Sequence, residues 1–250
     1  MSAIVRLLPV TGAAAVRVWA FWAWWAVLIA IVVHKLDPKI GRLDCGLIGA
    51  AGVWVLAYFL GTALGPIGLF RASLLWVLGL AGTIYLWRDR PGRVLDRPSF
   101  GLGLALIAIG LAAVSLIPLQ LASPVAPYMD VLSWPASAQR VLTFGVYLPF
   151  DNDPYGIWGP NVQQPALELF YAFLGLGSFT RLAAVAESTL IFPIGALTIL
   201  ATYRLGVALF DDTAGGAAAL LLFLTTIFRW AEGMRGTAVA FVLAALGLAL

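Results

Sequence analysis

The chain has 250 residues, of which 62% are hydrophobic and only 11% are charged. Soluble domains contain about 45–50% apolar and about 25% charged residues, so this composition excludes an ordinary soluble enzyme. The 15 Lys and Arg residues exceed the 12 Asp and Glu residues only slightly. We therefore expect no nucleic-acid partner. The 10 Trp and 26 Gly residues and the mean hydropathy of +0.97 indicate helices whose main partner is the lipid bilayer.

Long apolar runs predict the membrane spans, because a bilayer core about 30 Å thick needs about 20 apolar helical residues. Arginines end several runs, since this side chain costs about 3 kcal/mol at the bilayer centre. The fold class that we predict is therefore all-α and polytopic, with about seven transmembrane helices. They cover residues 18–33, 47–64, 72–87, 101–122, 182–203, 214–228 and 237–250. The last run is short and has no polar flank, which predicts that the chain is truncated at its C-terminus.

Basic residues predict which side each loop faces, because cytoplasmic loops carry an excess of Lys and Arg. Lys35, Lys39 and Arg42 follow the first run, and four arginines lie between residues 88 and 97. The long connection 123–164 is poor in basic residues, so we place it on the opposite side. We expect an integral membrane protein whose long loop faces the periplasm or extracellular space.

Two further patterns near the spans indicate local roles. Trp19, Trp22 and the pair Trp24–Trp25 are typical of an aromatic belt at the membrane–water interface. Asp211 and Asp212 precede an apolar run, as capping residues of a helix on the cytoplasmic side do.

The connection 123–164 and the residues after it predict two interfacial amphipathic helices. From Asp130 onward, Val131, Trp134, Ala138 and Val141 recur at helical spacing, which is typical of a helix lying on the membrane surface. A segment rich in proline and glycine follows. Pro165 then opens a second apolar helix that runs to Gly177 and carries Glu168.

The order of residues in this region resembles the first external loop of the GT-C superfamily of integral-membrane glycosyltransferases. The resemblance is closest to the bacterial group of protein mannosyltransferases and aminoarabinose transferases, and it covers about residues 101–250. It rests on the succession Asp130, Trp134-Pro135, Arg140, Asn152-x-Pro154-Tyr155 and Pro165-x-x-Glu168-Leu169-x-Tyr171, followed by Arg181, Tyr203-Arg204-Leu205 and Gly215-Gly216.

The resemblance implies a domain organisation and an activity. Residues 1–100 are three leading transmembrane helices, and residues 101–250 are a GT-C-like catalytic module with the external loop 123–164. Such an enzyme uses a polyprenyl-phosphate-linked sugar as donor on the outer membrane face, and a lipid, glycan or protein as acceptor. Asp130 matches the loop aspartate of the family, which acts as the catalytic base or binds a divalent metal.

Glycosyl transfer from a lipid phosphate needs a base for the acceptor hydroxyl and positive charge for the departing phosphate. We assign Asp130 as the base, and expect arginines to hold the phosphate and aromatic rings to face the sugar. A divalent cation, Mg or Mn, has Asp130, Asp151 and Asp153 as its candidate ligands. The expected substrate-binding residues are Arg140, Tyr155, Glu168, Tyr171, Arg181, Glu232 and Arg235.

Structural roles compete with these assignments. Asp130 is also suited to cap a helix, Glu168 to favour a helix dipole, and Arg140 to extend from a surface helix into water. Glu187 lies inside an apolar run, where acids are functional candidates. A polytopic transporter or flippase subunit and a non-catalytic membrane scaffold fit the same hydropathy.

Overall fold

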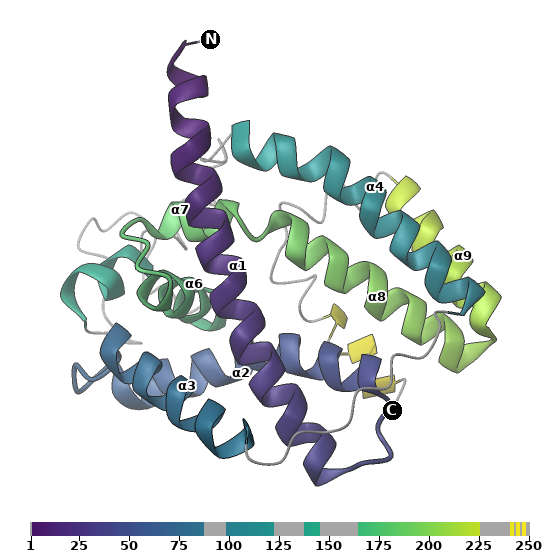
Figure 1. The fold of residues 1–250 in the computed structure, drawn as a ribbon, viewed down its shortest axis with the longest axis horizontal. Coiled ribbons are helices and arrows are strands. Elements are labelled where there is room, and N and C mark those ends of the chain that lie inside the picture. Colours follow the sequence, from purple (N-terminus) through teal and green to yellow (C-terminus); the bar gives the residue numbers. More distant parts are fainter. Residues whose placement is uncertain are drawn as a thin grey trace.

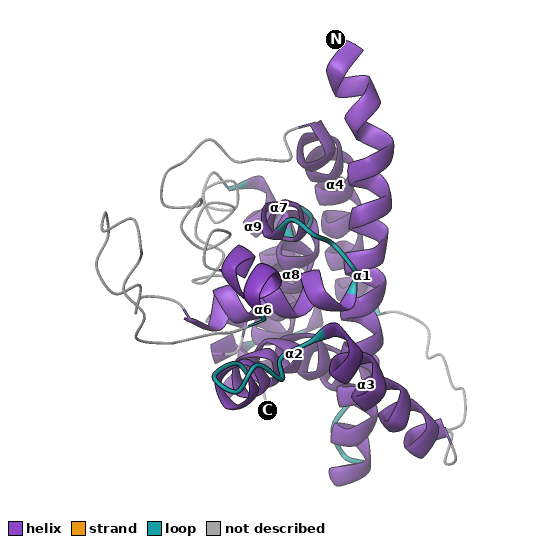
Figure 2. Cartoon of the chain, turned by 90° about the vertical axis from the view of Figure 1, so that its left-hand side faces the viewer, coloured by secondary structure: helices purple, strands orange, loops and turns teal. Residues whose placement is uncertain are grey.

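The computed structural model describes residues 2–87, 99–122, 138–145 and 165–225, and 241–248 except 243 and 246. Every regular element in these ranges is an α-helix (Figure 2). The all-α prediction is therefore confirmed for the described chain.

Four helical segments are long and apolar enough to cross a membrane, which makes this a membrane-embedded helical protein. They are Gly12–Leu36, Arg42–Leu64, Phe100–Ile117 and Val185–Leu209. The number of seven spans stays a prediction. The helices are α1 (Ser2–Leu36), α2 (Arg42–Leu64), α3 (Ala72–Trp87), α4 (Phe100–Ala122), α6 (Pro165–Gly177), α7 (Ala183–Ser188), α8 (Ile191–Leu209) and α9 (Asp212–Leu224), with a short helix at 138–144.

The predicted span 182–203 is divided between two helices. Helix α7 ends at Ser188, and α8 begins at Ile191 and continues to Leu209. Trp19 of α1 lies against the interruption, and its Nε1–H donates to the carbonyl of Thr189 at 2.6 Å. The interruption is thus stabilised by a side chain from another helix, which sequence periodicity within one run does not reveal.

The helices form two groups. Helices α4, α8 and α9 lie side by side on the right of Figure 1, and they share a core of small and apolar side chains. Helices α1, α2, α3, α6 and α7 form the second group, with a larger core rich in aromatic side chains. Helix α1 passes in front of this second group in the same view.

Helix α6 lies inside the second group and is buried on nearly all sides. Leu167 and every residue from Leu169 to Leu174 are at most 3% exposed. Phe170 stacks on Trp54 of α2 with ring centroids 4.1 Å apart, and Phe173 contacts Phe21 and Trp25 of α1. The sequence predicted this helix correctly, but the expected single buried face is replaced by burial all round.

Two of the four tryptophans expected to form an interfacial belt are buried in protein, and the belt itself stays a prediction. Trp22 and Trp25 are 5% and 7% exposed and belong to the aromatic core around α6. Trp22 donates its indole N–H to the Ala50 carbonyl at 3.1 Å, and Trp24 donates to the Thr83 hydroxyl at 2.9 Å. These side chains join α1 to α2 and α3, because a buried indole gains a hydrogen bond and a large contact area together.

A methyl group at the end of α6 is expected to destabilise the fold. A Cβ on Gly177 would lie 2.0 Å from ring atoms of the buried Phe21, so we expect Gly177→Ala to cost about 1–3 kcal/mol. Gly103→Ala is the control, since a Cβ there meets nothing within 4 Å and alanine stabilises a helix interior by about 0.5–1 kcal/mol. Unfolding in detergent micelles, followed by circular dichroism, measures both. Equal effects of the two variants would contradict the packing of α6 against α1.

Candidate functional site at the Arg181 end

Two turns and the short helix 138–144 meet at one end of the molecule, which we call the Arg181 end. The indole N–H of Trp76, near the start of α3, donates to the carbonyl of Gly177, the last residue of α6, at 2.9 Å. This bond holds the α2–α3 turn against the α6–α7 turn. The turn between α1 and α2 lies at the other end of α2, about 34 Å away along its 23 residues.

Gln139 joins the short helix to the α6–α7 turn. Its Nε2 donates to the Arg181 carbonyl at 3.0 Å, and its Oε1 accepts from the Ala183 backbone N–H at 3.0 Å. The second bond satisfies a backbone donor in the first turn of α7, as a capping side chain does. Gln139 thereby holds its neighbour Arg140 at the same end as Arg181. Sequence reasoning did not select Gln139, because nothing local marks a glutamine that caps a distant helix.

Arg71 reaches the other end of the short helix. Its Nε–H donates to the carbonyl of Gly68 at 2.7 Å. The Nε atom also lies 3.9 Å from the position that a Cβ would occupy on Gly145, where the short helix ends. In the sequence Arg71 is only a residue that ends an apolar run, and its place beside residues 138–145 depends on the tertiary fold.

The short helix carries Arg140, and the turns that hold Arg71 and Arg181 lie at its two ends. Arg71 and Arg181 are exposed and Arg140 is half-buried. Among the described residues, Arg71 and Arg181 form no ion pair. Exposed guanidinium groups without a carboxylate partner are suited to bind an anionic oxygen, and phosphate fits their planar donor geometry.

Two buried carboxylates come from the helices next to these arginines. Glu168, in the first turn of α6, is 3% exposed, and Glu187, in the last turn of α7, is 4% exposed. Tyr171 lies one turn after Glu168 and is completely buried. Of the predicted substrate-binding residues, Arg140 and Arg181 are thus at least partly accessible to a ligand, whereas Glu168 and Tyr171 are enclosed by protein.

The remaining candidates lie outside the described residues. These are the predicted base Asp130, the predicted metal ligands Asp151 and Asp153, and the predicted substrate contacts Tyr155, Glu232 and Arg235. Within the described ranges, no group of three or more His, Cys, Asp or Glu side chains is placed to hold a metal ion. Metal binding by Asp130, Asp151 and Asp153 stays a prediction.

An exposed aromatic residue with unusual backbone geometry completes the Arg181 end. Phe179 has φ 54° and lies in the α6–α7 turn, two residues before Arg181. This left-handed conformation costs a non-glycine residue about 1–2 kcal/mol. The ring stacks on Trp76, with centroids 6.0 Å apart and an interplanar angle of 14°, and such a pair returns about 0.5–1.5 kcal/mol. The cost of the left-handed backbone and the gain from ring stacking nearly cancel.

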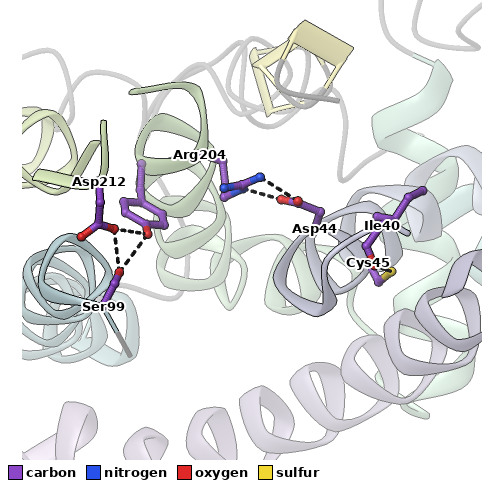
Figure 3. Close-up of polar contacts among 7 residues, drawn as sticks. Ile40, Asp44, Cys45, Ser99, Arg204 and Asp212 are labelled. Carbon is purple, nitrogen blue, oxygen red and sulfur yellow. Dashed lines mark hydrogen bonds and ion pairs between the residues drawn. The ribbon is translucent and has the colours of Figure 1, made fainter. Parts of the chain in front are cut away.

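A second polar cluster lies at the opposite end of the molecule and joins helices α4, α8 and α9 (Figure 3). The carboxylate of Asp212 accepts hydrogen bonds from the hydroxyls of Ser99 at 2.6 Å and Tyr203 at 2.7 Å, and from the Gly101 N–H at 2.7 Å. Chiefly the Ser99 hydroxyl, then Tyr203 and the Gly101 N–H, hold the pKa of Asp212 below its usual value. Asp211, as predicted, caps α9 by accepting from the Ala214 N–H at 2.8 Å.

An ion pair links the two helix groups near the same end (Figure 3). The Nε and Nη2 atoms of Arg204 in α8 donate to the two carboxylate oxygens of Asp44 in α2, the second bond being 2.7 Å long. Asp44 is 7% exposed. This bidentate geometry satisfies a buried charge, so we assign both this pair and the Asp212 cluster to structural roles rather than to ligand binding.

Comparison of the chain with protein-family models, curated proteins and solved structures found no match. The resemblance to the GT-C superfamily therefore rests on the order of the sequence motifs, and the functional argument below rests on the residues themselves.

Acid is expected to weaken the junction of α4 with α9. Because the pKa of Asp212 is lower in the folded protein than in the unfolded chain, its stabilising contribution is complete above about pH 4. The contribution is lost as pH falls through the lower, folded-state pKa. Wild type should therefore lose more stability than Asp212→Asn between pH 5 and about 3.

Ser99→Ala tests whether the Ser99 hydroxyl is the main cause of the lowered pKa of Asp212. The variant removes the hydroxyl that lowers the pKa most, so its acid-induced loss of stability should be smaller than that of wild type and should be complete at a higher pH. Thermal unfolding in micelles across this pH range measures all three proteins. Parallel pH profiles would contradict the role given to Asp212.

Proposed function

We propose that this protein is a membrane glycosyltransferase that moves a sugar from a polyprenyl-phosphate donor to a lipid, glycan or protein acceptor. The observation that carries the proposal is the set of arginines at the Arg181 end. The short helix carries Arg140, and Arg71 and Arg181 belong to the turns beside it and form no ion pair within the described chain. A lipid-linked phosphate at the membrane surface matches this charge and this position.

The reaction makes one bond and breaks one. The acceptor hydroxyl oxygen attacks the anomeric carbon of the sugar, and the bond from that carbon to the phosphate oxygen breaks. The hydroxyl proton passes to the base, for which we propose Asp130, and the phosphate leaves on its polyprenyl chain. Guanidinium groups stabilise the charge that develops on the departing phosphate. A divalent cation held by Asp130, Asp151 and Asp153 would supply further positive charge there.

The charge distribution supports a site on the outer face. The turn that holds Lys39 lies at the end of α2 away from Arg71. Under the positive-inside rule, that basic turn faces the cytoplasm. The Arg181 end then faces the periplasm or extracellular space of a bacterial inner membrane, where polyprenyl-phosphate sugars are used by the glycosyltransferases that this sequence resembles.

The interrupted helix near Glu187 supports a second candidate, a transporter, since transporters bind ions at broken helices. In such sites the backbone carbonyls freed by the break coordinate the ion. Here the carbonyl of Thr189, at the break, already accepts a short hydrogen bond from Trp19. We therefore favour the glycosyltransferase.

Replacing the proposed base should abolish transfer. Membranes that contain wild type or Asp130→Asn are supplied with radiolabelled polyprenyl-phosphate sugars, and label that moves to any acceptor is counted. We expect transfer by wild type and a loss of about 100-fold or more in the variant, because general-base catalysis contributes about 10²–10⁴-fold. Equal protein levels in the membrane provide the control. Retained activity in Asp130→Asn would remove Asp130 from the mechanism, and no transfer by wild type would favour the transporter.

The arginines at the Arg181 end should bind the donor phosphate. Arg181→Gln keeps a polar side chain that can donate hydrogen bonds but removes the charge. We expect a rise in KM for the donor of about tenfold, the loss of roughly one charge-assisted hydrogen bond. Lys39→Gln makes the same charge change at the opposite end and should leave KM unchanged. An unchanged KM in Arg181→Gln would show that the donor phosphate binds elsewhere.

A further inference from the structure

Phe179 occupies a position at which helices usually have glycine. The Thr180 N–H donates to the Gly175 carbonyl at 2.9 Å, and the Phe179 N–H donates to the Leu176 carbonyl at 3.3 Å. These two bonds form a Schellman motif, in which the left-handed residue is most often glycine because it lacks a Cβ. Phenylalanine at this point is a bulky residue in a conformation that such residues rarely adopt. Strained positions of this kind are concentrated at functional sites.

The ring of Phe179 is nevertheless exposed and fixed in direction. Phe179 is 65% exposed, although Trp76, on which its ring stacks, packs against the aromatic core around α6. One face stacks on Trp76. Trp76 is itself held by its hydrogen bond to Gly177 and by contact with Trp24, at a centroid distance of 4.9 Å. The two rings form an aromatic platform whose outer surface belongs to Phe179.

Two arginines belong to the turns that carry this platform. Arg181 follows Phe179 by two residues, and Arg71 precedes Trp76 by five residues in the turn that enters α3. The hydrogen bond from Trp76 to Gly177 holds the two turns together. An aromatic face near arginines that form no ion pair with any described residue suits a ligand that carries an anion next to an apolar ring face. A phosphate joined to a sugar has this character, because the C–H bonds on one face of a sugar ring pack on aromatic rings.

We propose that the platform of Phe179 on Trp76 binds the sugar ring of the polyprenyl-phosphate donor, while Arg71 and Arg181 bind its phosphate. This inference rests on the function proposed above. Phe179 is then a residue that contacts substrate and contributes to specificity for a glycosylated lipid over the bare lipid phosphate. Arg71 becomes a phosphate ligand from the leading helices, outside the module that resembles the GT-C superfamily.

The test separates recognition from packing, because glycine fits the backbone at position 179 better than phenylalanine does. The full chain is purified into zwitterionic nanodiscs, with wild type beside Phe179→Gly. Phe210→Gly is the matched control, since Phe210 is also an exposed ring, 79% accessible, at the C-terminal end of a helix, but at the opposite end of the molecule. Binding is measured for bare polyprenyl phosphate and for polyprenyl-phosphate mannose, glucose and aminoarabinose.

We expect wild type to bind at least one glycosylated lipid more tightly than the bare phosphate. Phe179→Gly should lose about five- to tenfold in affinity for that lipid, while keeping the affinity for bare phosphate and the thermal stability of wild type. Phe210→Gly should match wild type in both. Arg71→Gln should weaken the binding of all four lipids, whereas Lys39→Gln should change none.

The outcomes distinguish the two proposals. If Phe179→Gly keeps the preference for the sugar, or loses thermal stability together with all binding, Phe179 is a packing residue and this inference fails alone. If wild type binds the lipids but shows no preference for any sugar, the platform does not bind a sugar. If wild type binds none of the four lipids, the glycosyltransferase itself is overturned. Weakened binding in Lys39→Gln would show attraction to charge in general rather than a site.

Discussion

The packing of α6 against aromatic side chains of α1 and α2 is the constraint on which the rest of the structure depends. Thirteen helical residues span only about 20 Å, less than a bilayer core, so α6 needs protein around it rather than lipid. Within a membrane the hydrophobic effect does not favour helix association, and close packing must do so instead. Gly61 provides it on α2, where a Cβ would lie 2.4 Å from Leu169.

This packing also fixes the geometry of the Arg181 end. Because Phe170 and Phe173 are held by rings of α1 and α2, the C-terminus of α6 lies beside Trp76 of α3. The turn after α6 is then placed next to the turn before α3. This core brings the turn that holds Arg71 next to the turn that holds Phe179 and Arg181, although the two turns are far apart in the sequence. A binding site on rigid helix ends can hold a ligand in one orientation.

At the opposite end, hydrogen bonds and an ion pair fix the positions of the helices. Asp212 joins the first turns of α4 and α9 to Tyr203 of α8, and the pair of Arg204 with Asp44 connects this group to α2. A buried ion pair contributes little net stability, but removal of one partner is costly, so such a pair specifies which helices meet. The Arg204–Asp44 pair and apolar contacts such as those of Leu47 and Ala51 with Ala201 thus determine how the two groups are arranged.

The sequence by itself determined the helices of this protein, because apolar runs and capping residues act within one or two turns. Pro165 and Asp211 begin helices as predicted, and four predicted spans contain helices of sufficient length. Local signals also selected Arg140 and Arg181. The tertiary structure decided the rest. Tryptophans suit a membrane interface and a core equally well, and only the packing around α6 shows that Trp22 and Trp25 are buried. The roles of Arg71, Gln139 and Asp212 depend on partners tens of residues away, brought close by helix packing that no local pattern encodes.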